Sequence, residues 1–169
     1  MPPPLQVTVR PATPRDRLDV RRILDGAMLE VGDVEAHIEA GDVFVATEVQ
    51  QRERGRDQNR DQEPDTDTDR ILGALVCESR DLERDARAHD DDHEKDAHGH
   101  PHAHISAIAV RRRQRARGVG TALVEHVLER EGALTARFDE SVRPFYDSLG
   151  FSITQIAERR YEGRRRRSE

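Results

Sequence analysis

The sequence lacks several features that would place it in a membrane or secreted class. It has no apolar run approaching 18 residues, which excludes a membrane-spanning helix. Its single cysteine, Cys77, cannot form a disulfide within the chain. The opening residues Met1 to Pro4 contain neither the charged segment nor the apolar segment of a secretory signal. We therefore expect a cytoplasmic protein that does not associate with membranes.

Apolar residues are also scarce: they make up 34% of the 169 residues, whereas charged residues make up 37%. A typical soluble domain is closer to half apolar. The shortage lies in residues 51–70 and 80–103, which together account for the whole net charge of −6. The rest of the chain has equal numbers of acidic and basic residues, which argues against a nucleic-acid partner. We expect a single domain over residues 1–163, two disordered polar insertions at 51–70 and 80–103, and a basic tail at 164–169.

Hydrophobic periodicity and turn residues divide this domain into strands and helices. Thr13, Pro14 and Asp16 combine a capping hydroxyl, a proline at the first helical position and an acid, which is typical of a helix start. Strands are expected at 5–10, 42–49, 71–77, 105–110, 133–138 and 151–157, and helices from residue 14, at 33–40, at 119–130 and at 141–149. A seventh strand is either absent or lies within 159–162. This order indicates an α/β or α+β fold with a central sheet of mixed direction.

The most informative segment is residues 115–120, Arg-Ala-Arg-Gly-Val-Gly, between an expected strand and an expected helix. The first turn of a helix has free backbone N–H groups and a partial positive charge. Glycine lets a phosphate approach the backbone closely, and Arg115 and Arg117 add charge beside it. The spacing is neither that of a Walker loop nor that of a dinucleotide-binding turn. The segment favours a diphosphate ligand, and the alternative is an arginine-rich loop before a surface helix.

A second motif follows the next expected strand, where the sequence reads Phe-Tyr-Asp-Ser-Leu-Gly-Phe at residues 145–151. This motif and the triplet of Arg115, Gly118 and Gly120 together resemble the GNAT superfamily of acyl-CoA-dependent N-acyltransferases. The opening Val9 to Thr13 is also similar to the first strand and helix start of many members. The resemblance implies a mostly antiparallel sheet of about six or seven strands with about four helices, in which the fourth strand diverges from the fifth.

The resemblance also implies acetyl-CoA as the co-substrate, with its pantetheine arm between the fourth and fifth strands. Backbone groups of Ile108, Ala109 and Val110 would pair with the arm. The pyrophosphate would be held at the start of the next helix by Arg115, Arg117, Gly118, Val119, Gly120 and Thr121. Asp139 stands where many members have an asparagine that holds the arm, and an ionised aspartate has no amide donor. We interpret the side chains of Arg111, Arg112 and Arg113 as solvated.

Transfer of an acetyl group from a thioester to an amine needs a group that removes the amine proton and an acid for the departing thiolate. Tyr146 matches the position of the family's usual acid, and its alternative role is that of a packed helix aromatic. His104 falls where some members that acetylate lysine have a catalytic glutamate, so it is a candidate base. Alternatively, His104 only ends a polar loop, and ordered water is the base, as in many members.

The histidines that lead up to His104 have alternate spacing, with no cysteine among them and no closed tetrahedral arrangement. We therefore expect a solvated loop and no metal requirement. The sequence predicts a monomeric or homodimeric N-acetyltransferase whose acceptor is a primary amine on a protein N-terminus, a lysine or a small molecule. The alternatives are a non-catalytic acyl-CoA-binding or sensing module and a histidine-rich metal-binding protein.

Overall fold

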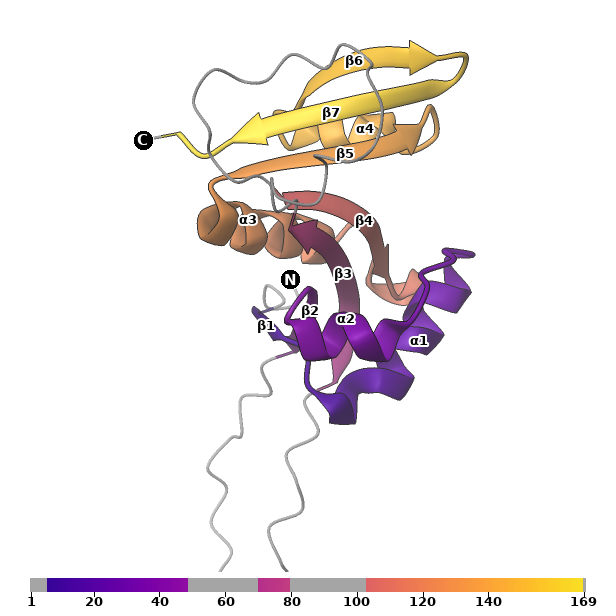
Figure 1. Ribbon diagram of the computed structural model, residues 1–169, viewed down its shortest axis with the longest axis vertical. Helices are drawn as coiled ribbons and strands as arrows, with labels where there is room; N and C mark the ends of the chain where they lie inside the picture. The colour runs from indigo at the N-terminus through magenta and orange to yellow at the C-terminus, as the bar shows by residue number, and fades with distance from the viewer. Residues whose placement is uncertain (1–5, 49–69, 80–102, 169) are drawn as a thin grey trace, which may run out of the picture.

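The computed structural model describes residues 6–48, 70–79 and 103–168 (Figure 1). The two expected disordered insertions therefore lie outside the described residues, apart from Arg70 and Ala103 at their ends. None of the described helices is long and apolar enough to span a membrane.

In the part of the chain that the structure describes, seven strands form one sheet in the order β1-β2-β3-β4-β5-β7-β6. All neighbouring strands are antiparallel except β4 and β5, which are parallel. The strands are β1 (Val7–Pro11), β2 (Val43–Glu48), β3 (Ile71–Ser79), β4 (Ala103–Val110), β5 (Ala133–Asp139), β6 (Ser152–Ala157) and β7 (Arg160–Arg166). The α-helices are α1 (Arg17–Gly26), α2 (Val34–Ala40), α3 (Val119–Glu131) and α4 (Arg143–Ser148), with short 3₁₀ helices η1 (Pro14–Asp16) and η3 (Arg112–Gln114). The expected fold class, a mixed and mostly antiparallel sheet with about four helices, is confirmed.

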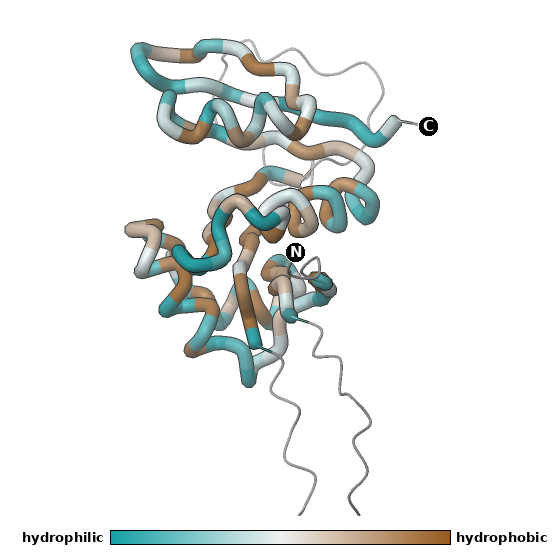
Figure 2. Tube along the Cα trace, turned by 180° about the vertical axis from the view of Figure 1, so that it is seen from behind, coloured by the Kyte–Doolittle hydropathy of each residue, from teal (hydrophilic) through white to brown (hydrophobic). Residues whose placement is uncertain are grey.

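The helices cover the two faces of the sheet unequally. Helices α1 and α2 share a core with apolar residues of β2, β3 and β4 on one face. Helices α3 and α4 share a second core on the other face, which continues onto β5. Figure 1 shows α4 behind β7, and the view from behind in Figure 2 shows it in front of the same strands. The face of β5, β7 and β6 that lies away from α4 contributes nothing to the core beneath α1 and α2.

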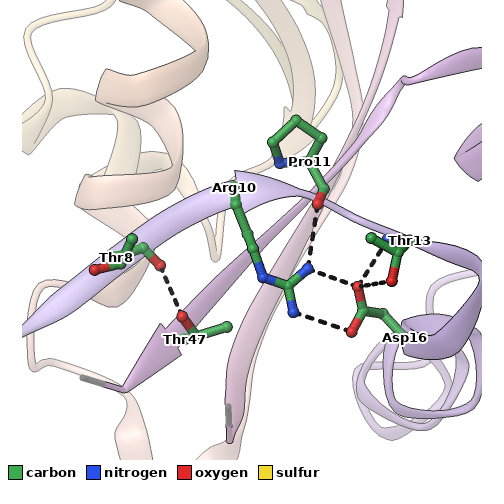
Figure 3. A network of polar contacts seen from close by, with 6 residues as sticks. All are labelled: Thr8, Arg10, Pro11, Thr13, Asp16 and Thr47. Carbon is green, nitrogen blue, oxygen red and sulfur yellow. Dashed lines mark hydrogen bonds and ion pairs between the residues drawn. The ribbon is translucent and has the colours of Figure 1, made fainter. Parts of the chain in front are cut away.

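The first helix begins as the sequence predicts. The backbone N–H of Thr13 donates to Asp16 Oδ2 at 2.7 Å, and the Thr13 hydroxyl donates to the same oxygen at 3.0 Å. Arg10 from β1 donates to both carboxylate oxygens of Asp16, at 2.7 and 3.1 Å (Figure 3). Burial opposes ionisation of Asp16, but these donors outweigh it and lower the pKa of the carboxyl. The network fixes the end of β1 to the start of α1.

The C-terminal strand corrects the expectation that a seventh strand is absent or lies within 159–162. β7 runs from Arg160 to Arg166 and lies between β5 and β6, so both of its edges are paired. β7 contains almost no apolar residues, and its packing depends instead on a glycine. A Cβ at Gly163 would lie 3.0 Å from Phe138 Cε1 and 3.1 Å from Phe151 Cδ1. The close approach of these rings, rather than an apolar pattern, places the strand.

Strands β4 and β5 separate after only three paired positions. Ala103 to Ile105 pair with Leu134 to Ala136, and the rest of β4 has no partner in β5. The separation coincides with a β-bulge, because Cys77 pairs with Ile105 whereas the preceding Val76 pairs with Ala107. Ser106 is therefore the extra residue of β4. A bulge bends its strand and leaves the extra residue unpaired, so the bulge accounts for the expected divergence of the fourth strand from the fifth.

The bulge also reverses which residues of β4 face each core. Before Ser106, Ala103 and Ile105 pack into the core under α3. After it, Ile108 and Val110 pack against that core, whereas Ala107 and Ala109 face α1 and α2. The expected contacts of the cofactor arm, Ile108, Ala109 and Val110, all lie on the part of β4 that β5 has left.

Candidate functional site

The turn before α3 has a backbone shape suited to an anion. Arg115 is extended, with φ −66° and ψ 154°, whereas Ala116 and Gly118 have left-handed φ values of 58° and 80°. Left-handed residues within a turn point successive N–H groups into a common concavity, which binds anions. Gly118 tolerates this conformation freely, whereas the Cβ of Ala116 makes it cost about 1–2 kcal/mol. Such strain persists where a function requires the shape.

The same glycine leaves the start of α3 uncapped. Gly118 is the N-cap residue, and no side-chain cap is present. The first N–H groups of a helix have no partner within the helix, so the amides of Val119, Gly120 and Thr121 remain available. Because α3 is 13 residues long, its dipole adds a partial positive charge at this end. The predicted phosphate-binding turn therefore has the required backbone geometry.

The arginine side chains of this turn fold back onto their own loop. Arg115 Nε donates to the carbonyl oxygen of Val110 at 3.3 Å. Arg117 Nη1 donates to the side-chain oxygen of Gln114 at 2.9 Å, and Gln114 itself is buried. These contacts hold the loop against the end of β4 and supply positive charge beside the exposed backbone amides.

Arg111 corrects the interpretation of residues 111–113 as solvated. Its Nε donates to the carbonyl oxygen of Ile71 at 2.7 Å, and its Nη2 pairs with Asp19 Oδ1 at 2.9 Å. Its backbone N–H also donates to the carbonyl oxygen of Leu72 at 2.8 Å. Arg111 therefore ties the loop after β4 to β3 and α1. Arg112 and Arg113 are exposed, as expected.

Helix α4 connects the start of α3 with the free part of β5. A Cβ at Gly120 would lie 3.0 Å from Phe145 Cε2 and 3.7 Å from a methyl carbon of Val110. The neighbouring ring of Tyr146 stacks on Phe138 of β5, with ring centres 4.3 Å apart. Phe138 lies beyond the last β5 residue that pairs with β4. Phe145 and Tyr146 therefore bridge the two strands where they have separated.

Tyr146 has the properties of a neutral hydroxyl held in an apolar setting. Its ring is buried and meets Phe145 and Phe151 edge-on, each with ring centres 5.1 Å apart. Burial raises the pKa of its phenol above the ordinary value. At neutral pH the hydroxyl is therefore protonated and can donate a hydrogen bond.

His104 lies at the closed end of the separation. It pairs with Glu78 of β3 and Thr135 of β5, so it belongs to β4 and not to the preceding loop. Its Nδ1 lies 3.0 Å from the hydroxyl oxygen of Thr135. A contact to one ring nitrogen fixes the ring orientation, which a base requires. His104 is one residue away from Ile105, the last β4 residue that pairs with β5.

Asp139 is occupied by a local turn. The backbone N–H of Ser141 donates to its Oδ1 at 2.9 Å, and the Ser141 hydroxyl donates to the same atom. The hydrogen bonds from Ser141 lower the pKa of the carboxyl. Asp139 is thus an ionised acceptor that shapes the start of α4, and it stays only a weak candidate for contact with the cofactor.

The remaining candidates are simpler. Cys77 is buried, and burial raises the pKa of its thiol to about 12, which fits a core residue and not a nucleophile. The histidine run before His104 lies outside the described residues. Within the described ranges, no three His, Cys, Asp or Glu side chains are grouped as metal ligands would be.

The special backbone of Ala116 and Ser106 is not identified from the sequence, for different reasons. No feature of Ala116 distinguishes it as a left-handed residue. The bulge at Ser106 does leave a signal, because the large apolar side chains change phase between Ile105 and Ile108. Reading that change as a bulge would have located the end of the β4–β5 pairing.

Known proteins share this architecture. The family model for the acetyltransferase (GNAT) domain matches residues 67–153. The structure of Ard1 from Thermoplasma volcanium is 21% identical with a TM-score of 0.61, and the alignment covers 96% of this chain and 99% of that one. Naa50 from Arabidopsis thaliana, in complex with the bisubstrate analogue CoA-Ac-MVNAL, is 18% identical with a TM-score of 0.61, covering 94% and 97%. N-acetylglutamate synthase from Neisseria gonorrhoeae, complexed with coenzyme A and L-arginine, is 14% identical with a TM-score of 0.60, covering 96% of this chain and 33% of that chain.

These structural likenesses, all below 25% identity, show the fold. No curated protein matches the sequence. The family match spans more than half of the chain and contains the bulged strand, the glycine turn and the Phe-Tyr motif of α4. The chain belongs to the GNAT acetyltransferase family.

Proposed function

We propose that this protein transfers an acetyl group from acetyl-CoA directly to a primary amine. The observation that carries the proposal is the joint position of two features. The uncapped start of α3 follows directly on the loop after β4, and the adjoining part of β4 has no strand partner on its β5 side. One feature suits a diphosphate, and the other suits an extended polar arm that hydrogen-bonds like a strand.

The residues that would hold acetyl-CoA are those of the sequence prediction. Ile108, Ala109 and Val110 offer strand backbone to the pantetheine arm, and Arg115 together with the amides from Arg117 to Thr121 offers donors to the diphosphate. Gly118 fits this role because no described atom lies within 4 Å of the point where its Cβ would be, whereas the missing Cβ of Gly120 makes room for the ring of Phe145. The start of α3 is thus open to a close approach that a side chain would obstruct.

Tyr146 is proposed to assist the departure of the thiolate. Its raised pKa exceeds that of an ordinary thiol, so complete proton transfer to a thiolate is uphill. The phenol therefore acts first as a hydrogen-bond donor that stabilises negative charge as it develops on sulfur, and this effect is strong in an apolar setting. The unpaired backbone of the Ser106 bulge is the candidate hydrogen-bond donor to the carbonyl oxygen of the acetyl group, because the bulge lies where β4 and β5 separate.

His104 is proposed to accept the proton of the amine, directly or through an ordered water. Its position at the closed end of the separation supports this role, and Thr135 orients the ring. A neutral imidazole has one ring nitrogen without a proton, and this nitrogen can accept the proton of the amine. The candidate acid and base thus lie on opposite faces of the sheet, with Tyr146 on the α3 side and His104 on the other.

The structural relatives support the cofactor more than the acceptor. Two of them were solved in complex with coenzyme A or a CoA conjugate. The conjugate CoA-Ac-MVNAL is a peptide joined to the cofactor, whereas the synthase acts on an amino acid according to its name. A protein N-terminus, a lysine and a small amine all remain candidate acceptors for this chain.

Two assays test the proposal. Acetyl-CoA at 100 times its dissociation constant should stabilise the fold by about 2.7 kcal/mol and raise the melting temperature. Release of free thiol from acetyl-CoA should then depend on an added amine from a panel of peptides, lysine derivatives and small amines. Stabilisation without thiol release for any amine would support a non-catalytic acyl-CoA-binding module instead. Absence of both effects would refute the proposal.

A further inference from the structure

One face of β5, β7 and β6 is not covered by any other residue that the structure describes, and it has a fixed set of side chains. Gly163 faces Phe138 and Phe151 on the α4 side, so its neighbours in β7, Glu162 and Arg164, face the other way. Arg137 of β5 is the direct partner of Glu162 and shares its face. The cores beneath α1 and α2 take no residue from these three strands, so among the described residues no helix packs over this face. Figure 1 shows the three strands with α4 only on their far side, and Figure 2 shows the C-terminal strand as predominantly hydrophilic.

Two arginines on this face share one carboxylate. Arg137 Nε donates to Glu162 Oε2 at 3.1 Å, and Arg164 donates to Glu162 Oε1 from Nε at 3.1 Å and from Nη2 at 2.9 Å. The side chain of Glu162 is only 17% exposed, whereas those of Arg137 and Arg164 are 43% and 55% exposed. The group therefore has a net positive charge, and each guanidinium keeps N–H donors that its bonds to Glu162 do not use. Glu162 holds the two guanidinium groups in place on the surface.

This arginine pair lies beside the proposed reaction centre. Arg164 is the direct partner of Thr135, and Thr135 is the partner of His104. Ala136, the last β5 residue that pairs with β4, lies next to Arg137 in sequence. Directly paired residues are about 5 Å apart and alternate residues of a strand about 7 Å apart. Both guanidinium groups can therefore reach an acceptor whose amine lies near His104.

We propose that Arg137 and Arg164 bind carboxylates of the acceptor, so that this protein acetylates the amine of an acidic peptide or protein segment. The inference rests on the proposed acetyl transfer and adds the class of acceptor. Charge complementarity supports this acceptor class, because carboxylates match the fork of a guanidinium and Glu162 leaves the pair with an excess positive charge. An open sheet face accommodates an extended segment, whereas a free amino acid would be better held in an enclosed pocket. The acidic side chains would follow closely after the reactive amine.

The test compares two decapeptides that differ only at positions two to four, which are glutamate in one and lysine in the other. The wild-type protein should acetylate the glutamate peptide with the higher kcat/KM, and added salt should reduce the difference. Arg164→Glu and Arg137→Glu should each lower the ratio of the two kcat/KM values by about three- to fivefold, as expected for partly exposed ion pairs. Arg164→Gln should lower it less, and Arg15→Glu, an equal charge change at an exposed residue of η1, should leave it unchanged.

A second readout keeps this inference separate from the proposed function. Fluorescence anisotropy of the labelled glutamate peptide, with coenzyme A present, measures binding without chemistry, and melting temperatures show whether each variant folds. If acetyl-CoA neither binds nor reacts, the proposed function fails. If transfer occurs at equal rates for both peptides, or Arg164→Glu and Arg164→Gln leave the ratio and the peptide binding unchanged, only the acidic-acceptor inference fails. Faster acetylation of free glutamate than of the glutamate peptide would overturn the choice of an extended segment.

Discussion

Replacing Tyr146 by phenylalanine separates its proposed chemical role from its structural role. Phenylalanine keeps the ring contacts with Phe138, Phe145 and Phe151, whose ring centres lie 4.3 to 5.1 Å away. No hydrogen bond joins the hydroxyl to another described residue, so its removal should change the unfolding free energy by about 0.5 kcal/mol or less. Tyr146→Ala removes the whole buried ring and should cost about 3–5 kcal/mol. At about 2–4 °C per kcal/mol for a domain of this size, only the alanine variant should melt at a clearly lower temperature.

Tyr146→Phe should have a large effect on catalysis even though its effect on stability is small. Loss of an acid or hydrogen-bond donor to the leaving group typically lowers turnover by about 10²–10⁴. Tyr146→Phe should therefore have a much lower kcat with an unchanged acetyl-CoA dissociation constant, measured by thiol release and by calorimetry. Tyr161→Phe is the matched control, since it changes the other of the two tyrosines and should leave kcat unaltered. The reasoning is refuted if Tyr146→Phe keeps the wild-type turnover, or if it destabilises the fold as much as Tyr146→Ala.

Three further predictions concern the loop, its anchor and the response to pH. Gly118→Ala places a Cβ at a φ of 80°, so it should lower the unfolding free energy by about 1 kcal/mol. It should also reduce the rise in melting temperature caused by acetyl-CoA, and an unchanged rise would exclude this turn from cofactor binding. Arg111→Ala loses the contacts to Ile71 and Asp19, so its unfolding free energy, measured in urea, should be lower by about 1–3 kcal/mol. Arg111→Lys should recover part of the loss, and equal stability of the wild type and both variants would contradict the anchoring role of Arg111. Because burial raises the pKa of Cys77 to about 12, its thiol stabilises the fold fully below about pH 8.5, and this contribution should disappear as the pH rises towards 12. The raised pKa of Tyr146 acts in the same direction above about pH 10, so Cys77→Ala should flatten only the lower part of the alkaline melting profile.

Much of the fold can be predicted from the sequence because its local signals agree with its packing. Thr13 and Asp16 form the expected helix start, and the continuous apolar run of β2 and the apolar stripe of α3 both enter the core. β7 is missed because arginines and a glycine form most of it, and its place depends on pairing with two other strands. Non-local pairing leaves little trace in the local pattern.

The residues of the site also differ in how well the sequence predicts their roles. Gly118 and Gly120 can be assigned from the spacing of their motif, and the structure gives Gly118 a left-handed φ and Gly120 a close contact with a ring. The anchoring role of Arg111 cannot, because its partners Asp19 and Ile71 are distant in sequence. The sequence predicts His104 close to the start of β4. Its contact with Thr135 cannot be predicted in this way, because it depends on the parallel pairing of β4 and β5.

Amide hydrogen exchange tests the central claim most directly. Coenzyme A added to the full chain should slow exchange at the backbone amides from Ala116 to Thr121, and at the part of β4 around Ile108 to Val110 that does not pair with β5. The terminal residues of β6 and β7 should exchange as before. Binding of coenzyme A that leaves the start of α3 unprotected would contradict the claim that these amides hold its diphosphate.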